Sequence, residues 1–186
     1  MRFFILAGLV GAALFITVLP ASAAAWQGYV SREAGFSFTA PGAVKTEKAT
    51  YRSASANQRG ATVFRSLEDN IEYKVTVVDF TGRTNDEAAL IKEAATQYST
   101  GKKVLVDVEA RVDQNYGRKM ASDLANNGGR SMAGFYFKDG RLIQLEVTVL
   151  PANGDYGTPD TSRFVDSVAF LASRVEPGST ELTLAK

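Results

Sequence analysis

The sequence predicts an α+β fold in which helices cover an antiparallel β-sheet, an α/β/α sandwich. Several stretches alternate apolar and polar residues with the period of two that is typical of half-buried strands. The pair Asp139-Gly140 stands between two β-rich stretches, where both residues tolerate the positive φ of a tight hairpin turn. Two short helices stand among strands that are mostly connected as hairpins, which favours an antiparallel sheet.

The chain of 186 residues begins with the pattern of an export signal. Residues 1–25 contain one charge, Arg2, followed by the apolar run 3–19 and then by small residues, with Ala21 and Ala23 at suitable positions for signal peptidase. An uncleaved membrane anchor is the alternative, but the apolar run is at the short limit for spanning a bilayer, which favours cleavage. We expect a periplasmic or secreted protein, which touches the membrane only if this segment is retained.

The composition excludes several kinds of active site. The chain has no His and no Cys, so it has no zinc site built on those residues, no Ser-His-Asp triad, no cysteine nucleophile and no disulfide. It has 21 basic and 20 acidic side chains, and the extra positive charge is Arg2 of the signal. This balance argues against a nucleic-acid-binding surface. The length predicts one domain over 26–175, followed by a flexible tail over 176–186.

The strands are predicted from alternation and from turn residues. In 71–77 the odd-numbered residues are apolar and the others polar, and 104–112 alternates in the same way. The hairpin around Asp139-Gly140 joins a strand that ends near Lys138 to a returning strand over 142–150. Weaker strands are expected at 36–39, 51–53, 61–67 and 119–125, and the last is followed by the bend Asn126-Asn127-Gly128-Gly129.

Two helices are predicted from their capping residues. Thr84 and Glu87 have the spacing of a capping box, and the helix that they begin runs to Thr100, with its apolar stripe on Ala88, Ile91, Ala95 and Tyr98. The second helix begins at Thr158-Pro159-Asp160, with proline at its first position, and buries Phe164, Val165 and Val168.

Five ordered motifs carry a family resemblance. They are Glu33-Ala34-Gly35-Phe36-Ser37-Phe38-Thr39-Ala40-Pro41-Gly42, then 73–80, 115–118, 139–145 and 163–170. In order and spacing, over residues 28–170, they resemble the Mog1/PsbP-like fold of many small secreted bacterial proteins. The chain departs from the pattern at Ala43-Val44, where a second proline is expected. The resemblance implies a sheet covered by helices and a binding or assembly role, and it is an analogy because fold does not determine function.

Two groups of acidic residues are candidate metal sites, and neither is favoured. Asp107, Glu109 and Asp113 share a strand face, but Arg111 lies between them and is expected to pair with them. In the loop 151–161, Asn153-Gly154-Asp155 and Asp160 lack the spacing of a calcium loop, and Asp160 is explained as a first-turn acid of the second helix. We therefore predict no metal and no cofactor.

Two further segments are candidate binding surfaces. The basic stretch consists of Lys45, Lys48, Arg52, Arg59 and Arg65, with Tyr51 and Phe64 among them, and exposed strands explain it better than a lipid or acidic partner does. Tyr116, Gly117 and Arg118 are the predicted site residues: they either form a recognition corner for a carboxylate, or serve a backbone turn and an internal salt bridge.

The function that these observations favour is an exported, non-enzymatic binding or assembly-accessory domain for a protein or a cell-envelope component. One alternative is a hydrolase or lyase that works through carboxylates, Ser, Tyr or Lys. Another is a carrier of a small apolar ligand, with a cavity between sheet and helix lined by Phe135, Phe137 and Leu142.

Overall fold

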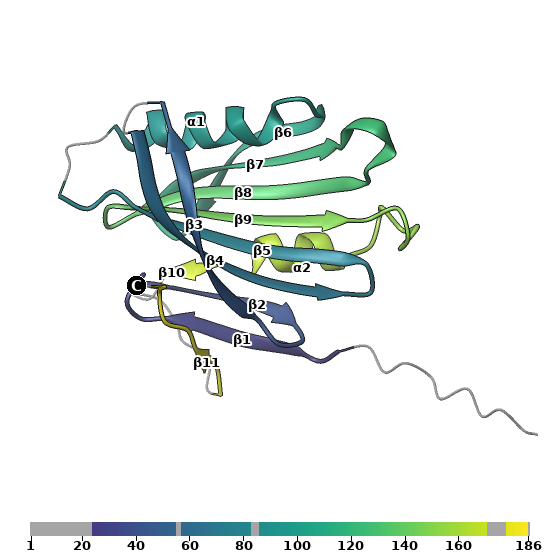
Figure 1. The fold of residues 1–186 in the computed structure, drawn as a ribbon, viewed down its shortest axis with the longest axis horizontal. Helices are drawn as coiled ribbons and strands as arrows, with labels where there is room; N and C mark the ends of the chain where they lie inside the picture. Colours follow the sequence, from purple (N-terminus) through teal and green to yellow (C-terminus); the bar gives the residue numbers. More distant parts are fainter. Residues whose placement is uncertain (1–23, 55–56, 83–85, 171–177, 186) are drawn as a thin grey trace, which may run out of the picture.

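The computed structural model describes residues 24–54, 57–82, 86–170 and 178–185 (Figure 1). The predicted export signal, 1–25, therefore lies outside the described residues except for its last two. Among the residues that are described, no helix is long and apolar enough to cross a membrane.

Two β-sheets build the domain (Figure 1). The large sheet is antiparallel throughout, with the strand order β3 (Lys45–Ser53), β4 (Asn57–Glu68), β5 (Ile71–Asp79), β9 (Arg141–Val149), β8 (Arg130–Lys138), β7 (Asn115–Asp123) and β6 (Lys103–Val112). The small sheet has the order β10 (Ala169–Phe170), β2 (Phe36–Pro41), β1 (Trp26–Ser31) and β11 (Thr180–Glu181). The short 3₁₀ turn η1 (Ala125–Asn127) lies between β7 and β8, at the predicted bend.

The strands predicted from alternation are confirmed, and each is longer than its pattern. β5 covers the predicted 71–77, and β6 covers 104–112. Asp139 and Gly140 both have positive φ, 48° and 76°, and join β8 to β9 as expected. Asp69 and Asn70 make the same kind of turn between β4 and β5, with φ of 48° and 55°.

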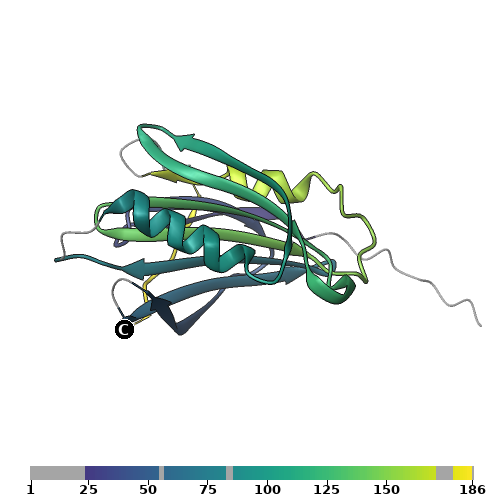
Figure 2. The ribbon, with the colours of Figure 1, turned by 90° about the horizontal axis from the view of Figure 1, so that it is seen from above.

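Helix α1 (Glu87–Ser99) lies on one face of the large sheet, against β7, β8 and β9 (Figure 2). Thr84 of the predicted capping box lies outside the described residues, and the residue that caps α1 is Asp86, whose side chain accepts a hydrogen bond from the Ala89 N–H at 3.1 Å. Its buried residues are Leu90, Ala94, Ala95 and Tyr98. The predicted stripe was therefore right at Ala95 and Tyr98, but Ala88 is exposed and Ile91 only half-buried.

The Asp86 cap gives a direct test of where α1 begins. We expect Asp86→Ala to lower the free energy of unfolding by about 1 kcal/mol, because the Ala89 N–H loses its acceptor at a helix end. Asp86→Asn keeps an acceptor oxygen and is expected to stay close to the wild type. Urea denaturation of the three proteins measures the difference, and equal stabilities of all three would contradict this assignment of the cap.

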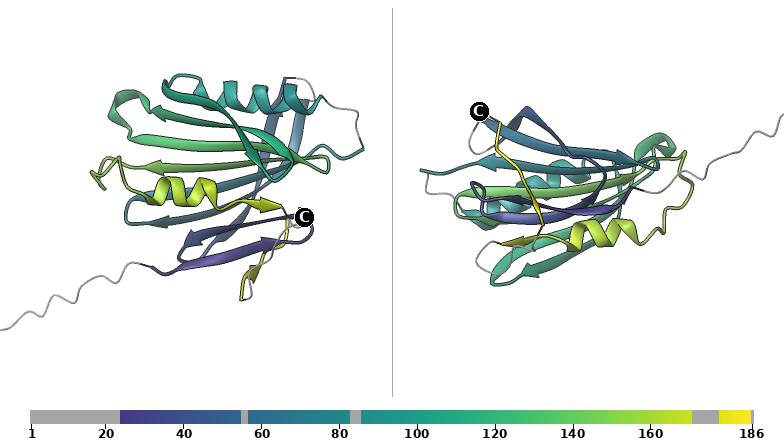
Figure 3. Two further views of the ribbon diagram at one scale, coloured as in Figure 1. Left: turned by 180° about the vertical axis from the view of Figure 1, so that it is seen from behind. Right: turned by 90° about the horizontal axis from the view of Figure 1, so that it is seen from below.

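The opposite face of the large sheet is covered by the small sheet together with α2 (Asp160–Asp166) (Figure 3). Phe38 of β2 contacts Phe64 of the large sheet and Phe164 of α2, with ring centroids 6.4 and 6.1 Å apart. The predicted α/β/α sandwich is therefore not confirmed, because a second sheet, and not a helix layer alone, covers this face. The physical reason is that β1 and β2 have apolar inward faces of their own, including Tyr29 and Phe36, and these bury the sheet on that side.

The C-terminal segment differs from the predicted flexible tail. Within 176–186, β11 pairs with β1 in parallel, and the Leu182 N–H donates to the Val30 carbonyl at 2.7 Å. The Leu182 side chain is buried in the core between the sheets, and the Ala185 N–H donates to Thr62 Oγ1 at 3.0 Å. The two leucines of this segment, Leu182 and Leu184, are too few to predict a strand from sequence, and the segment docks because β1 offers an edge to pair with and the core between the sheets takes up Leu182.

Candidate functional site

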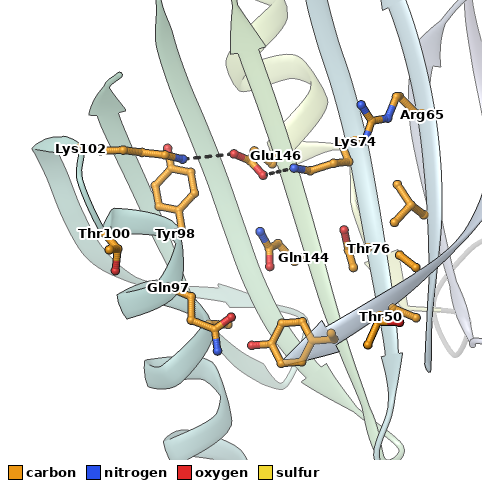
Figure 4. A pocket seen from close by; sticks show the side chains of 15 residues that line it. Thr50, Arg65, Lys74, Thr76, Gln97, Tyr98, Thr100, Lys102, Gln144 and Glu146 are labelled. Atoms are coloured by element: carbon orange, nitrogen blue, oxygen red, sulfur yellow. Dashed lines mark hydrogen bonds and ion pairs between the residues drawn. The ribbon is translucent and has the colours of Figure 1, made fainter. Parts of the chain in front are cut away.

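One part of the large sheet is left uncovered by α1, and this part is polar. On β5 and β9 the residues that face α1 change from apolar, at Val78 and Leu142, to polar. Because the two strands are in register, Thr76 lies opposite Gln144 and Lys74 lies opposite Glu146. The concavity that results has a volume of about 400 Å³ (Figure 4). We call it the polar concavity; its polar lining consists of Thr50, Tyr51, Arg65, Lys74, Thr76, Gln97, Tyr98, Thr100, Lys102, Gln144 and Glu146.

The floor of the polar concavity holds one carboxylate between two ammonium groups (Figure 4). Lys74 Nζ lies 2.5 Å from Glu146 Oε2, and Lys102 Nζ lies 3.3 Å from Glu146 Oε1. The Ser131 hydroxyl donates to the same carboxylate at 3.5 Å. The side chain of Glu146 is only 12% exposed, so its charge is stabilised by these partners more than by water.

The two lysines determine the ionisation of Glu146. Burial by itself raises the pKa of this carboxyl, but the attraction and hydrogen bonds of Lys74 and then Lys102 outweigh it, and the pKa is lowered from its ordinary value. Glu146 therefore stays charged at neutral pH. The three groups together carry one net positive charge.

The C-terminal turn of α1 positions Lys102. Its ammonium group lies 3.7 Å from the centroid of the Tyr98 ring, in cation–π contact, and its backbone N–H donates to the Ser99 carbonyl at 3.0 Å. Burial raises the pKa of Tyr98 to about 12, and the nearby Ser131 and Ser122 side chains only partly oppose this effect. Lys102 is thus fixed above the sheet by an aromatic ring that is itself part of the core beneath α1.

Tyr51 of β3 forms the other wall. Its hydroxyl is buried and makes no hydrogen bond to any residue that the structure describes. Burial, followed by repulsion from Glu93, raises the pKa of Tyr51 to about 12, so the hydroxyl is neutral and can donate or accept. A ligand in the polar concavity would meet the Tyr51 side chain, the Gln144 amide and the two ammonium groups.

These groups are arranged for binding more than for proton transfer. General acid–base catalysis at neutral pH needs a group whose pKa lies near 7. The Glu146 pKa is shifted downward, and the Tyr51 and Tyr98 pKa values are shifted upward, so each moves away from that range. A negatively charged group is the ligand that the net charge of the concavity favours.

The predicted site residues Tyr116, Gly117 and Arg118 are brought to one place, a second cavity of about 270 Å³ between α1 and the start of β7. Tyr116 is 67% exposed and stacks with Arg111, whose guanidinium lies 5.1 Å from the ring centroid. The guanidinium of Arg118 binds the Asp107 carboxylate with two hydrogen bonds, of 2.5 and 2.7 Å. This bond lowers the pKa of Asp107, and it is the internal salt bridge that the sequence left open as one role for Arg118.

Gly117 has a packing role that the sequence did not reveal. It lies within β7 opposite Tyr136, and its φ is not positive, so it does not serve a turn. A Cβ atom at this position would lie 2.3 Å from Tyr136 Cδ1 and 2.5 Å from the Phe135 carbonyl oxygen. Glycine is therefore required where the buried Tyr136 ring crosses the strand.

The other candidates form no second site. Asp107 pairs with Arg118, whereas Arg111, its expected partner, donates to the Asp113 carbonyl and to Gln114. In the described part of the chain, no group of three or more acidic side chains is placed to hold a metal ion. In the basic stretch, Lys45, Lys48 and Arg52 are exposed on β3, Arg59 packs on Phe80, and Arg65 pairs with Glu72.

Lys74 and Glu146 of the polar concavity were missed in the sequence because each looks like an ordinary exposed strand residue. Lys74 and Glu146 stand at polar positions of alternating strands that are 72 residues apart. Only the antiparallel register of β5 and β9 makes them neighbours. One signal was present in the sequence: each of two otherwise apolar strands carries a charged residue, and the two charges have opposite signs. This signal can be recognised only when the pairing register of the two strands is known.

Comparison with known proteins identifies the fold. No protein-family model matches the sequence, and a search of the curated proteins gives no match either. Among solved structures, the solution structure of cyanobacterial PsbP (CyanoP) from Synechocystis sp. matches with a TM-score of 0.54 and 14% identity, covering 83% of this chain and 97% of that one. A crystal structure of a Pseudomonas aeruginosa protein of unknown function matches with a TM-score of 0.37 and 12% identity, covering 57% of this chain and 85% of that one. The likeness to the cyanobacterial structure shows that this chain has a PsbP-like fold, as its ordered motifs predict.

Proposed function

We propose that this chain is an exported, non-enzymatic accessory domain that binds a protein or envelope component, and that the polar concavity holds an acidic group of that component. The observation that carries the proposal is the pairing of two lysines with one carboxylate. Lys74 and Lys102 leave one positive charge on an open, half-buried surface beside the Tyr51 side chain. A carboxylate or phosphate would complete this arrangement without desolvating a new cation.

Two further features support the proposal. The residues 1–25 have the pattern of a secretory signal, which favours export to the periplasm or beyond. The PsbP-like fold is compatible with an accessory role, although a fold alone assigns none.

The alternative of a small apolar ligand is less well supported. Phe135, Phe137 and Leu142, which would line its cavity, are buried in a core cluster with Phe80 and Leu90 beneath α1. A carrier needs space at these side chains, and here they pack against one another and against the helix.

In-cell photo-crosslinking tests the proposal. The photoreactive amino acid p-benzoyl-phenylalanine is placed at Thr100, an exposed residue on the rim of the polar concavity, in protein expressed in its native envelope. Gln144→Glu is then introduced in the same chain, since it adds a negative charge to the concavity with almost no change of shape. We expect a discrete adduct that Gln144→Glu reduces about tenfold, because like charges repel at a half-buried site.

The matched control is Gln27→Glu, the same substitution on an exposed residue of β1 away from the concavity. This variant is expected to keep the adduct. No adduct at Thr100, or an adduct that Gln144→Glu and Gln27→Glu affect equally, would contradict the assignment of the polar concavity.

A further inference from the structure

In the part of the chain that the structure describes, strand β6 is a free edge of the large sheet, and much of its exposed surface is apolar. Among the described residues it pairs with β7 alone, and β7 in turn pairs with β8, so β6 is the last strand of the large sheet (Figure 2). Four of the seven exposed large apolar side chains among the described residues lie on it: Val104, Leu105, Val106 and Val108, each between 40% and 49% exposed. An apolar edge strand is a site for pairing with another strand unless charges or prolines protect it.

The opposite edge of the same sheet shows the contrast. On β3 the exposed side chains are predominantly polar or charged, among them Lys45, Glu47 and Lys48. These charges protect β3 from pairing with other chains. β6 carries charges too, on Lys103, Asp107, Glu109 and Arg111, but of the two edges only β6 adds a row of exposed valines and a leucine.

The hairpin geometry tells which backbone groups of β6 are available. Val112 and Asn115 are paired across the two-residue turn, so they exchange hydrogen bonds with each other. By the alternation of an antiparallel ladder, Ala110 and Val108 also bond to β7. The N–H and C=O groups of Glu109 and Arg111 therefore point away from the sheet, where a further strand would lie.

The sequence of β6 is complementary to itself in one antiparallel register. With Ala110 opposite Ala110 of a second copy, Glu109 lies opposite Arg111 and Val108 lies opposite Val112, each pair occurring twice. Asp107 then lies opposite Asp113, which belongs to the turn, and the Asp107 carboxylate is already paired with Arg118. The neighbouring symmetric registers place Glu109 opposite Glu109, or Arg111 opposite Arg111, and like charges directly opposite each other are destabilising. Arg111 also donates to the Asp113 carbonyl at 3.1 Å, which leaves further N–H groups of its guanidinium for the second copy.

We propose that two copies of this chain associate through β6, antiparallel and centred on Ala110, so that their large sheets become one continuous sheet. Val112 of the second copy then lies beside Val108, at the rim of an apolar groove of about 220 Å³ that Met120 and Met132 also line. The ion pairs determine the register, and the valines contribute the buried apolar area. This association is independent of the polar concavity, which lies toward β3.

Disulfide trapping tests the register, because the chain contains no cysteine. In the proposed dimer Ala110 forms a non-hydrogen-bonded pair with its own copy, with a Cα–Cα distance of about 4.5 Å, which a disulfide can bridge. Under mild oxidation of the folded protein, Ala110→Cys is expected to form a covalent dimer. Val108→Cys is expected to form none alone and to form one when mixed with Val112→Cys.

Charge reversal supplies an independent readout by sedimentation equilibrium. Glu109→Arg and Arg111→Glu are each expected to weaken dimerisation about tenfold, and the double variant is expected to restore it. Lys48→Glu, on the other edge, should leave dimerisation unchanged. A wild-type protein that is monomeric at millimolar concentration, or cross-linking of Ala110→Cys no greater than that of Val108→Cys, would overturn the proposal and leave the edge to a strand of another protein.

Discussion

Gly117→Ala is expected to lower the free energy of unfolding by about 3 kcal/mol, which corresponds to a decrease in Tm of about 9 °C for a domain of this size. The added methyl group would overlap the Tyr136 ring at 2.3 Å and the Phe135 carbonyl oxygen at 2.5 Å. Displacing either group costs free energy, because Tyr136 and Phe135 are fully buried and Tyr136 also packs edge-to-face on Phe170. Thermal and urea denaturation of the purified variant measure the loss.

The control for this substitution is Gly60→Ala. Gly60 lies on β4 with an ordinary φ, and a Cβ atom there has no neighbour within 4 Å. This variant is expected to be as stable as the wild type, or more stable by about 0.5 kcal/mol, because alanine restricts the unfolded chain. If Gly117→Ala and Gly60→Ala proved equally stable, the close approach of Tyr136 to β7 would be refuted.

Glu146→Gln is expected to lower the stability by about 3 kcal/mol at pH 7, because it leaves Lys74 and Lys102 half-buried without their shared counter-charge. Because the substitution keeps the size of the side chain, the decrease in stability comes mainly from the lost charge and only to a small extent from changed packing. Denaturation measured at several pH values provides the test. The difference between wild type and variant should be largest at neutral pH.

The pH dependence of this difference has a definite sign. The pKa of Glu146 is lower in the folded protein than its ordinary value of 4.5, so ionised Glu146 stabilises the folded state above pH 4.5. This contribution is lost as the pH falls from 4.5 through the lowered pKa of the folded state. In Glu146→Gln this part of the acid sensitivity is expected to be absent, whereas Glu33→Gln, at an exposed residue between β1 and β2, should retain it. An identical pH profile of Glu146→Gln and wild type would contradict the ionised triad.

Much of the large sheet could be predicted from local sequence, because its strands carry their own pattern. Alternation in 71–77 and 104–112 predicted β5 and β6, and the positive φ of Asp139 and Gly140 is a property of that dipeptide. The ordered motifs predicted the PsbP-like fold that the structural comparison shows. Such features depend on residues within a few positions of one another.

The candidate site could not be predicted in the same way. The trio Tyr116-Gly117-Arg118 is predicted as a site because a Tyr-Gly-Arg turn after a strand could offer its arginine to a carboxylate, a pattern of adjacent residues, and it stays a prediction as a binding site. Lys74, Lys102 and Glu146 were overlooked because strand pairing and the end of α1 bring them together from three separate segments.

By itself, then, the sequence determined the strands, the hairpins and the exclusion of histidine and cysteine chemistry, since each of these is a property of local pattern or composition. Only the tertiary structure decided that a second sheet covers one face of the large sheet and that β11 adds a strand to this second sheet. It also decided that two lysines converge on one buried carboxylate. The physical reason is that burial and charge pairing depend on distances between residues far apart in the chain. Those distances are set by the register of the strands and by the length of sheet that α1 leaves uncovered.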